Sequence, residues 1–250
     1  MSSPSPSAGQ GGQGDAAPKG GSGEMFDAIA DKYDLVNRVI SLGIDQSWRR
    51  KAVRAMNLAE ASRVIDLATG TGDLAILTAK THPQVHVLGL DPSTKMLAVG
   101  EIKVKAEGLA DRVTMKVGDA QAIEADDASV DATSISFGIR NVPDRAKALR
   151  EMARVVRPGG RIVILELAEP TTPVLGPLAR WHIHTLVPAI GAALSGAREY
   201  RYLEKSIAAF PPREEFAALM EASNLKMIAA EPLTFGVATL YVATPAAEAK

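Results

Sequence analysis

The chain has 250 residues, 46% of them apolar, with no cysteine and only two tryptophans, four tyrosines and five phenylalanines. This length is typical of one globular domain, and the lack of cysteine excludes disulfides, thiolate metal sites and cysteine nucleophiles. The 28 lysines and arginines nearly balance the 29 aspartates and glutamates, so a net charge of −1 provides no positive field for nucleic acid. We therefore expect a core-forming cytoplasmic protein with no nucleic-acid partner.

The first 23 residues differ in composition from the rest of the chain. Residues 1–23 are rich in glycine, serine and proline and contain almost no apolar side chains. Such a segment cannot offset the entropy lost on ordering, so we expect a disordered tail ahead of a single domain over 24–250. The most apolar stretch, 173–195, is interrupted by an arginine, two histidines and a proline, which argues against a membrane-spanning helix.

The domain begins with helical periodicity and continues with alternating strands and helices. Apolar spacing predicts a helical lid over 24–58, whose second helix starts at Asp45 as N-cap and reaches Met56. We then expect strands over 63–67, 85–90, 113–117, 131–136 and 161–167, and helices over 73–80, 93–106 and 144–156. This order predicts an α/β fold with a mostly parallel, doubly wound sheet.

The alternation stops after residue 169. We expect a helical insert over 170–210, a helix over 214–222 and two strands over 226–230 and 234–243. Three residues separate these strands, too few for a helical crossover, so the strands must be antiparallel if they pair. The predicted sheet therefore ends with an antiparallel strand.

A glycine-rich turn follows the first predicted strand and opens the next helix. Gly70, Gly72 and Ala75 match the Gly-x-Gly-x-x-Ala pattern of dinucleotide-binding folds, and Asp91 lies where a ribose-binding acid is expected. On this motif alone, a nicotinamide-dependent oxidoreductase is an open alternative.

Two acidic residues weigh against a pyrophosphate ligand. Asp73 falls in the first turn of the helix, where its carboxylate would repel a phosphate, and Asp66 adds a second negative charge at the strand end. A ligand with an ammonium, a sulfonium, a ribose and an adenine but no phosphate fits this loop better. S-adenosyl-L-methionine is such a ligand, and we expect it as the cofactor.

Further polar residues occur where the other strands should end. Asp91 is placed to accept both ribose hydroxyls, Asp119 to meet the adenine amino group, and Ser136 to lie beside the sulfonium. Each acid could instead be an ordinary loop residue or helix cap. Their shared position at the carboxyl ends of strands, where such sheets bind ligands, indicates one site.

Several segments match one enzyme family: residues 25–37, 41–45, 48–49, 66–73, 134–141, 147–149, 156–160 and 202–207. On these stretches the chain closely resembles the ubiquinone/menaquinone biosynthesis C-methyltransferase family, which includes demethylmenaquinone methyltransferases and polyprenyl-benzoquinol methylases. The resemblance implies a Rossmann-like class I methyltransferase with a seven-stranded sheet. It also implies methyl transfer from S-adenosylmethionine to a ring carbon of a polyprenylated quinol.

The same resemblance implies five residues that contact the cofactor: Thr71, Asp91, Asp119, Ala120 and Ser136. The chain departs from the commonest family pattern at Thr69, where many relatives carry glycine. A side chain there is expected to narrow the loop while leaving Gly70 and Gly72 in place.

Methylation of a ring carbon without cysteine requires an electron-rich acceptor, so the quinol should react as its phenolate. Arg140 and Asn141 are the best catalytic candidates, with Arg140 stabilising the phenolate oxygen and Asn141 orienting the ring through a hydrogen bond. The alternative is structural: Arg140 pairs with an acid such as Asp144, and Asn141 caps the next helix.

Tyr33 and Asp34 on the lid are placed to close over the donor, although packing explains Tyr33 equally well. His182 and His184 would point to different helix faces, so no metal site is expected. The apolar stretch 173–195 fits a tunnel wall for a prenyl tail, a peripheral membrane contact, an ordinary buried helix or a homodimer interface. Another small aromatic or lipid substrate, and a protein that only binds the cofactor, are further alternatives.

Overall fold

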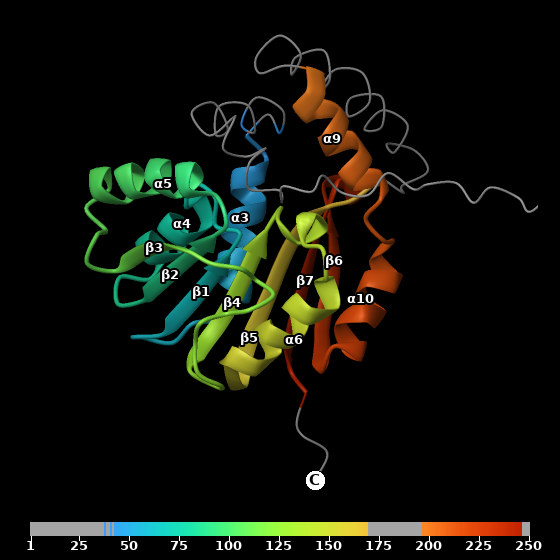
Figure 1. Cartoon of the computed structure of the whole chain (residues 1–250). Helices are drawn as coiled ribbons and strands as arrows, with labels where there is room; N and C mark the ends of the chain where they lie inside the picture. Colours follow the sequence, from blue (N-terminus) through green and yellow to red (C-terminus); the bar gives the residue numbers. More distant parts are fainter. Residues whose placement is uncertain (1–37, 39–40, 42, 170–196, 247–250) are drawn as a thin grey trace, which may run out of the picture.

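A seven-stranded sheet with the order β3-β2-β1-β4-β5-β7-β6 forms the centre of the molecule (Figure 1). The computed structural model describes residues 38, 41, 43–169 and 197–246. The strands are β1 (Arg63–Leu67), β2 (His86–Asp91), β3 (Val113–Val117), β4 (Val130–Ser136), β5 (Val156–Leu167), β6 (Leu225–Leu233) and β7 (Ala238–Pro245). β1 to β5 pair in parallel, whereas β7 is antiparallel to both β5 and β6. The predicted mostly parallel sheet with an antiparallel C-terminal strand is confirmed.

Helices cover both faces of this sheet. Three of them pack on one face, namely α3 (Asp45–Ala55), α4 (Asp73–Thr81) and α5 (Thr94–Ala106), while α6 (Arg145–Val155) and α10 (Arg213–Ala222) pack on the other. A further helix, α9 (Ala197–Ala208), contacts the short 3-10 helix η1 (Ile139–Asn141), which follows β4. Both helices therefore reach the edge of the sheet where the parallel strands end, α3 beside the glycine loop and α9 beside η1.

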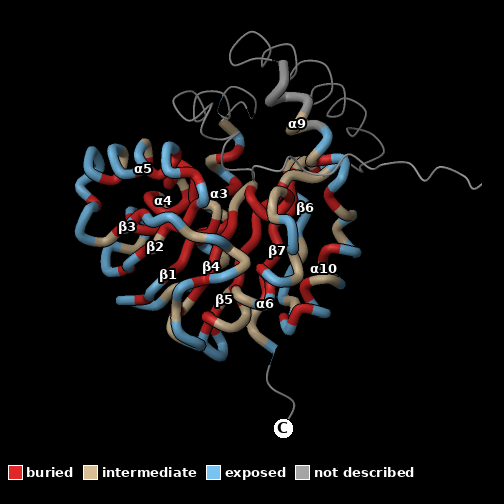
Figure 2. Tube along the Cα trace, viewed as in Figure 1, coloured by how far each residue is buried: buried red, intermediate tan, exposed pale blue. Residues whose placement is uncertain are grey.

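Alternation along the strands divides the core into two layers, and Figure 2 shows the buried residues concentrated in the sheet between the helices. Val64 packs with Trp48 on the side of α3 to α5, and its neighbour Ile65 packs with Met152 and Phe216 on the side of α6 and α10. Successive strand residues point to opposite faces, so an unbroken aliphatic run suits a strand that is covered on both sides.

Most predicted boundaries agree with the structure. Ser93 is the N-cap of α5, and its Oγ accepts a hydrogen bond from the Met96 N–H at 3.1 Å. Three predictions need correction. β5 begins at Val156, so the proline and glycines that follow lie within the strand, and the β6–β7 turn is the 3-10 helix η3 (Thr234–Gly236) rather than 231–233. The N-cap of α3 is Ile44, and Asp45 is the first helical residue.

The predicted tail, most of the lid and most of the insert lie outside the described residues. Tyr33, Asp34, His182 and His184 fall in these segments, as does the apolar stretch 173–195. Among the helices that the structure does describe, none has the length and hydropathy needed to cross a membrane.

Candidate active site

The glycine loop between β1 and α4 is shaped by two left-handed glycines. Gly70 has φ +57° and Gly72, the N-cap of α4, has φ +81°, a region that costs other residues conformational energy. A Cβ atom on Gly72 would also lie 3.2 Å from Cε of Met115. On the neighbouring helix, a Cβ on Gly100 would lie 3.2 Å from the Thr71 carbonyl carbon, so a glycine there lets α5 pack directly against the loop.

Asp91, at the end of β2, holds this loop through its backbone. Its Oδ2 accepts a hydrogen bond from the Gly70 N–H at 2.8 Å, and its Oδ1 accepts one from the Ser93 N–H at 2.8 Å. Asp91, which is predicted to bind the ribose, therefore also connects the loop after β1 with the segment after β2. The sequence spacing of the two residues suggested a cofactor contact but not this second role.

Asp66, at the end of β1, is buried and accepts hydrogen bonds from Thr69 Oγ1 at 2.7 Å and Ser134 Oγ at 2.6 Å. Burial raises the pKa of Asp66 to about 6, against the opposing effect of these two hydrogen bonds. The Thr69 side chain is thus turned toward Asp66. A Cβ on Gly89 of β2 would lie 2.9 Å from Thr69 Cγ2, so the glycine makes room for the threonine.

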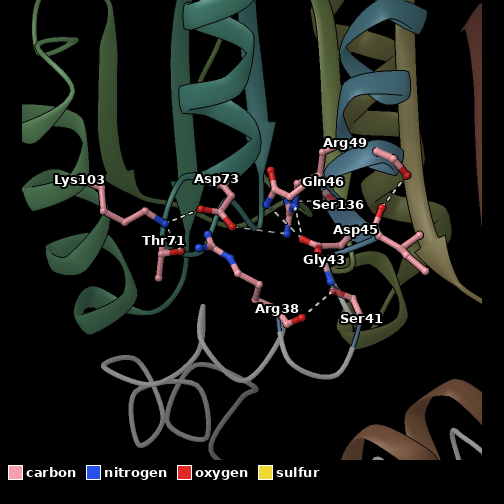
Figure 3. Close-up of polar contacts among 12 residues, drawn as sticks. Arg38, Ser41, Gly43, Asp45, Gln46, Arg49, Thr71, Asp73, Lys103 and Ser136 are labelled. Carbon is pink, nitrogen blue, oxygen red and sulfur yellow. Dashed lines mark hydrogen bonds and ion pairs between the residues drawn. The ribbon is translucent and has the colours of Figure 1, made fainter.

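Asp73 lies in the first turn of α4, as expected, but three cations, Arg49, Lys103 and Arg38, offset its charge (Figure 3). Lys103 Nζ is 2.5 Å from Asp73 Oδ1 and 3.1 Å from Thr71 Oγ1, and Arg49 Nη2 is 4.0 Å from Asp73 Oδ2. Burial alone would raise the pKa of Asp73, but these three cations, Arg49 and Lys103 more than Arg38, outweigh it and lower the pKa below its ordinary value. Neither Arg49 nor Lys103 was predicted from the sequence to be a site residue.

The other predicted cofactor residues lie at the ends of β3 and β4. Asp119 follows β3 and is exposed, with its Oδ1 accepting a hydrogen bond from the Gln121 N–H at 2.9 Å, and Ala120 beside it is partly buried. Ser136 ends β4, and its Oγ accepts a hydrogen bond from Arg49 Nη1 at 3.2 Å. Arg49 therefore connects the end of β4 with the start of α4.

Arg140 and Asn141 follow β4 in η1. Arg140 pairs with Glu166 of β5 at 2.6 Å, and its Nη1 also donates to the Phe137 carbonyl at 2.6 Å. The structural alternative is therefore right that Arg140 pairs with an acid but wrong about Asp144, which instead caps α6 by accepting from the Lys147 N–H. The structural alternative is also wrong about Asn141, because the residue that caps α6 is Asp144.

Asn141 contacts α9 instead. Its Oδ1 accepts a hydrogen bond from the Tyr202 hydroxyl at 3.1 Å, and Ser206 of the same helix is 3.3 Å from Arg140 Nε. The two catalytic candidates are thus both held by side chains of α9. Tyr202 and Ser206 lie in a segment that matched the family pattern, which is the one signal that the sequence offered for them.

The residues at this edge fit S-adenosylmethionine. Carboxylates lie near the ends of β1 and β2, Gly100 lets α5 pack directly against the glycine loop, and a third carboxylate, Asp73, lies between Arg49 and Lys103. These acids suit hydroxyl, ammonium and sulfonium groups and disfavour a pyrophosphate.

Comparison with known proteins agrees with this chemistry. A family model described as the ubiE/COQ5 methyltransferase family matches residues 17–245. The chain belongs to this family. A ubiquinone/menaquinone biosynthesis C-methyltransferase UbiE from a Geobacter species is 45% identical over 221 residues, which are 88% of this chain and 94% of that protein. A demethylmenaquinone methyltransferase from Thermus thermophilus is 42% identical over 219 residues, 87% of this chain and 98% of that protein.

Solved structures show the same fold. A putative S-adenosyl-L-methionine-dependent methyltransferase from Methanococcus maripaludis has a TM-score of 0.67 at 17% identity, covering 95% of this chain and 99% of that one. A geranyl diphosphate C-methyltransferase from Streptomyces coelicolor has a TM-score of 0.60 at 16% identity, covering 80% of this chain and 79% of that one. The predicted class I fold is confirmed. Membership of the ubiE/COQ5 family confirms the predicted methyltransferase activity and S-adenosylmethionine as cofactor, and it disfavours the oxidoreductase alternative.

Proposed function

We propose that this member of the ubiE/COQ5 family methylates a ring carbon of a polyprenylated quinol in the biosynthesis of menaquinone, ubiquinone or both. The observation that carries the proposal is identity of 42–45% to C-methyltransferases of these pathways over almost their full length. Arg140 and Asn141 support it, because they follow Ser136 of β4 closely and so place donors of hydrogen bonds beside the cofactor end of the sheet.

The chemistry of the acceptor defines what these residues must do. S-adenosylmethionine supplies an electrophilic methyl group on a sulfonium. A ring carbon attacks it readily when the adjacent oxygen carries negative charge, so the quinol should react as a phenolate. The methyl–sulfur bond breaks as the carbon–carbon bond forms, and the ring carbon then loses its proton. A nearby cation favours this ionisation by lowering the pKa of the phenol, and hydrogen bonds to the phenolate stabilise the charge further.

Arg140 is arranged to provide such a cation. Its Nη1 is held by Phe137 and Glu166 and its Nε by Ser206, whereas Nη2 has no hydrogen-bond partner among the described residues. Arg145 donates from its Nη2 to the Arg140 carbonyl at 2.9 Å, so a second guanidinium lies near the carboxylate of Glu166. The group therefore keeps a net positive charge, and we assign Arg140 Nη2 to the phenolate oxygen.

Asn141 complements Arg140. Because Tyr202 occupies its Oδ1, the amide nitrogen of Asn141 is the part left to donate a hydrogen bond to the acceptor. We assign this N–H to the orientation of the quinol ring. Tyr33 is proposed as a lid residue that excludes water. Peripheral contact with the inner face of the membrane and homodimer formation remain proposals for the stretch 173–195.

The decisive experiment incubates the protein and labelled S-adenosylmethionine with demethylmenaquinol or a demethylated benzoquinol, under reducing conditions with detergent. Label should appear in at least one quinol, and the product identifies the head group. Absence of label in both, from protein that binds S-adenosylmethionine, would refute the quinol substrate and favour another aromatic or lipid acceptor.

The role of Arg140 has its own test. Arg140→Lys keeps the charge but loses the planar fork, so methyl transfer should fall about 100-fold, as for loss of one oxyanion donor, while the Kd for S-adenosylmethionine stays nearly constant. The exposed Arg150→Lys of α6 is the matched control. Undiminished turnover of Arg140→Lys would exclude Arg140 as the group that binds the phenolate.

A further inference from the structure

Arg49 brings a buried positive charge into the predicted cofactor site. It lies in α3, and its side chain is 8% exposed. Its Nη1 donates to Ser136 Oγ, and its Cζ lies 5.1 Å from the centroid of the Phe137 ring, so the guanidinium is held at the end of β4 (Figure 3). Burying a charge here is costly unless its hydrogen-bonding groups have partners.

The guanidinium nevertheless has unused donor capacity. Its Nε is buried and has no hydrogen-bond partner among the described residues, although Asp45 lies 3.5 Å away. Its Nη2 is 4.0 Å from Asp73 Oδ2, which is too long for a hydrogen bond. Arginine often binds a carboxylate through two parallel N–H donors. A buried guanidinium that makes no hydrogen bond to a carboxylate of the protein therefore indicates a ligand with a carboxylate.

The charges around Arg49 define what kind of ligand fits. Asp73 lies between Arg49 and Lys103, and Lys103 also donates to Thr71 of the glycine loop. Asp45 lies 3.5 Å from Arg49 Nε, and Arg38 is a further cation near Asp73, so this side of the site carries groups of both signs. A ligand end that carries both a carboxylate and an ammonium matches this arrangement better than a group with a single charge.

We propose that Arg49 binds the α-carboxylate of S-adenosylmethionine, while Asp73 supplies the negative charge that the α-ammonium requires. Arg49 then belongs to the cofactor site, together with the predicted contacts Thr71 and Ser136. The assignment concerns the methyl donor alone and holds whatever the acceptor is. It also gives α3, at the border of the lid, a direct part in donor binding.

The test measures binding without turnover, by isothermal titration of three ligands that differ at one end. These are S-adenosylmethionine, decarboxylated S-adenosylmethionine, which lacks only the carboxylate, and 5′-methylthioadenosine, which lacks the amino-acid group. Arg49→Gln should weaken binding of S-adenosylmethionine by about 10- to 100-fold, the range expected for losing charged hydrogen bonds. Binding of the other two ligands should change less than about threefold, which is within ordinary mutational scatter.

Arg50→Gln, an exposed neighbour in α3, is the matched control and should bind all three ligands as the wild type does. Arg49→Lys covers the case in which Arg49→Gln does not fold, and should show a smaller loss confined to S-adenosylmethionine. Equal weakening of all three ligands would show that Arg49 only supports the fold. Unchanged binding of S-adenosylmethionine would likewise overturn the assignment. Neither outcome bears on the quinol acceptor, which the labelling experiment tests separately.

Discussion

Nη1 of Arg140 lies 2.6 Å from Oε1 of Glu166, and these side chains are 6% and 0% exposed. The carboxylate also accepts hydrogen bonds from the Arg140 N–H at 3.1 Å and the Leu167 N–H at 2.8 Å. One buried glutamate of β5 thus fixes both the backbone and the side chain of the leading catalytic candidate. Because three donors converge on it, Glu166 cannot be replaced without leaving a buried group unpaired.

We expect Glu166→Gln to lower the free energy of unfolding by about 3 kcal/mol, since it leaves the buried Arg140 charge uncompensated. Urea denaturation measures the change, and the exposed Glu221→Gln of α10 should be neutral. Replacing the pair by Arg140→Met with Glu166→Leu should recover part of the loss, because no charge is then buried, although the N–H groups of residue 140 and Leu167 still lose their acceptor. Wild-type stability of Glu166→Gln would contradict this account of the pair.

Tyr202→Phe removes the hydroxyl that donates to Asn141 Oδ1 and leaves the ring in place. We expect methyl transfer to fall about tenfold, the value of one ordinary hydrogen bond, because the Asn141 amide is then free to turn. The Kd for S-adenosylmethionine should not change. In an Asn141→Ala background the same substitution should have no further effect, and additive losses would mean that Tyr202 acts independently of Asn141.

Asp66 should make stability depend on pH. Its folded-state pKa of about 6 exceeds the ordinary 3.8, so the folded protein binds the proton more tightly than the unfolded chain does. Asp66 therefore contributes stability that is present below pH about 4 and is lost as the pH rises to about 6, an effect of about 3 kcal/mol on the free energy of unfolding. Urea unfolding across this range should show a weaker dependence for Asp66→Asn. The exposed Asp111→Asn should retain the wild-type dependence, and parallel curves for all three proteins would refute the prediction.

Gly89 and Thr69 should be energetically coupled. A Cβ on Gly89 would lie 2.9 Å from Thr69 Cγ2, and Thr69 is anchored to Asp66 by its hydroxyl. We expect Gly89→Ala to destabilise the protein by about 1–3 kcal/mol through overpacking. In a Thr69→Gly background the cost should drop by about 1 kcal/mol, measured as the coupling in a double-mutant cycle of denaturation free energies. Additive effects would show that Met115, which the Cβ would also crowd, dominates the cost.

The strand and helix order was predictable because it rests on local signals. Ser93 and Asp144 cap helices that begin one residue later, and glycine or proline separates most elements. The connection between β6 and β7 was placed too early, because Pro232 usually ends a strand. In the structure it lies in the edge strand β6, the kind of strand in which proline is tolerated.

The site was predictable where its residues follow strands. Asp91 and Ser136 end parallel strands and Asp66 is one residue from the end of β1, and parallel strands end at one edge. Arg49 and Lys103 were missed because each comes from a helix and meets the site only through packing, Arg49 reaching Ser136 across 87 positions. Glu166 left a weak signal, since it is one charged residue in an otherwise aliphatic strand.

The sequence by itself determined the class of fold, the glycine loop and the kind of ligand that this loop accepts, because hydrophobic periodicity, turn residues and acids at strand ends are local properties. Only the tertiary structure decided which charges meet: Arg49 with Asp73, and Arg140 with Glu166 rather than Asp144. The strength of an ion pair depends on distance and burial, and both are set by how the helices and strands pack together.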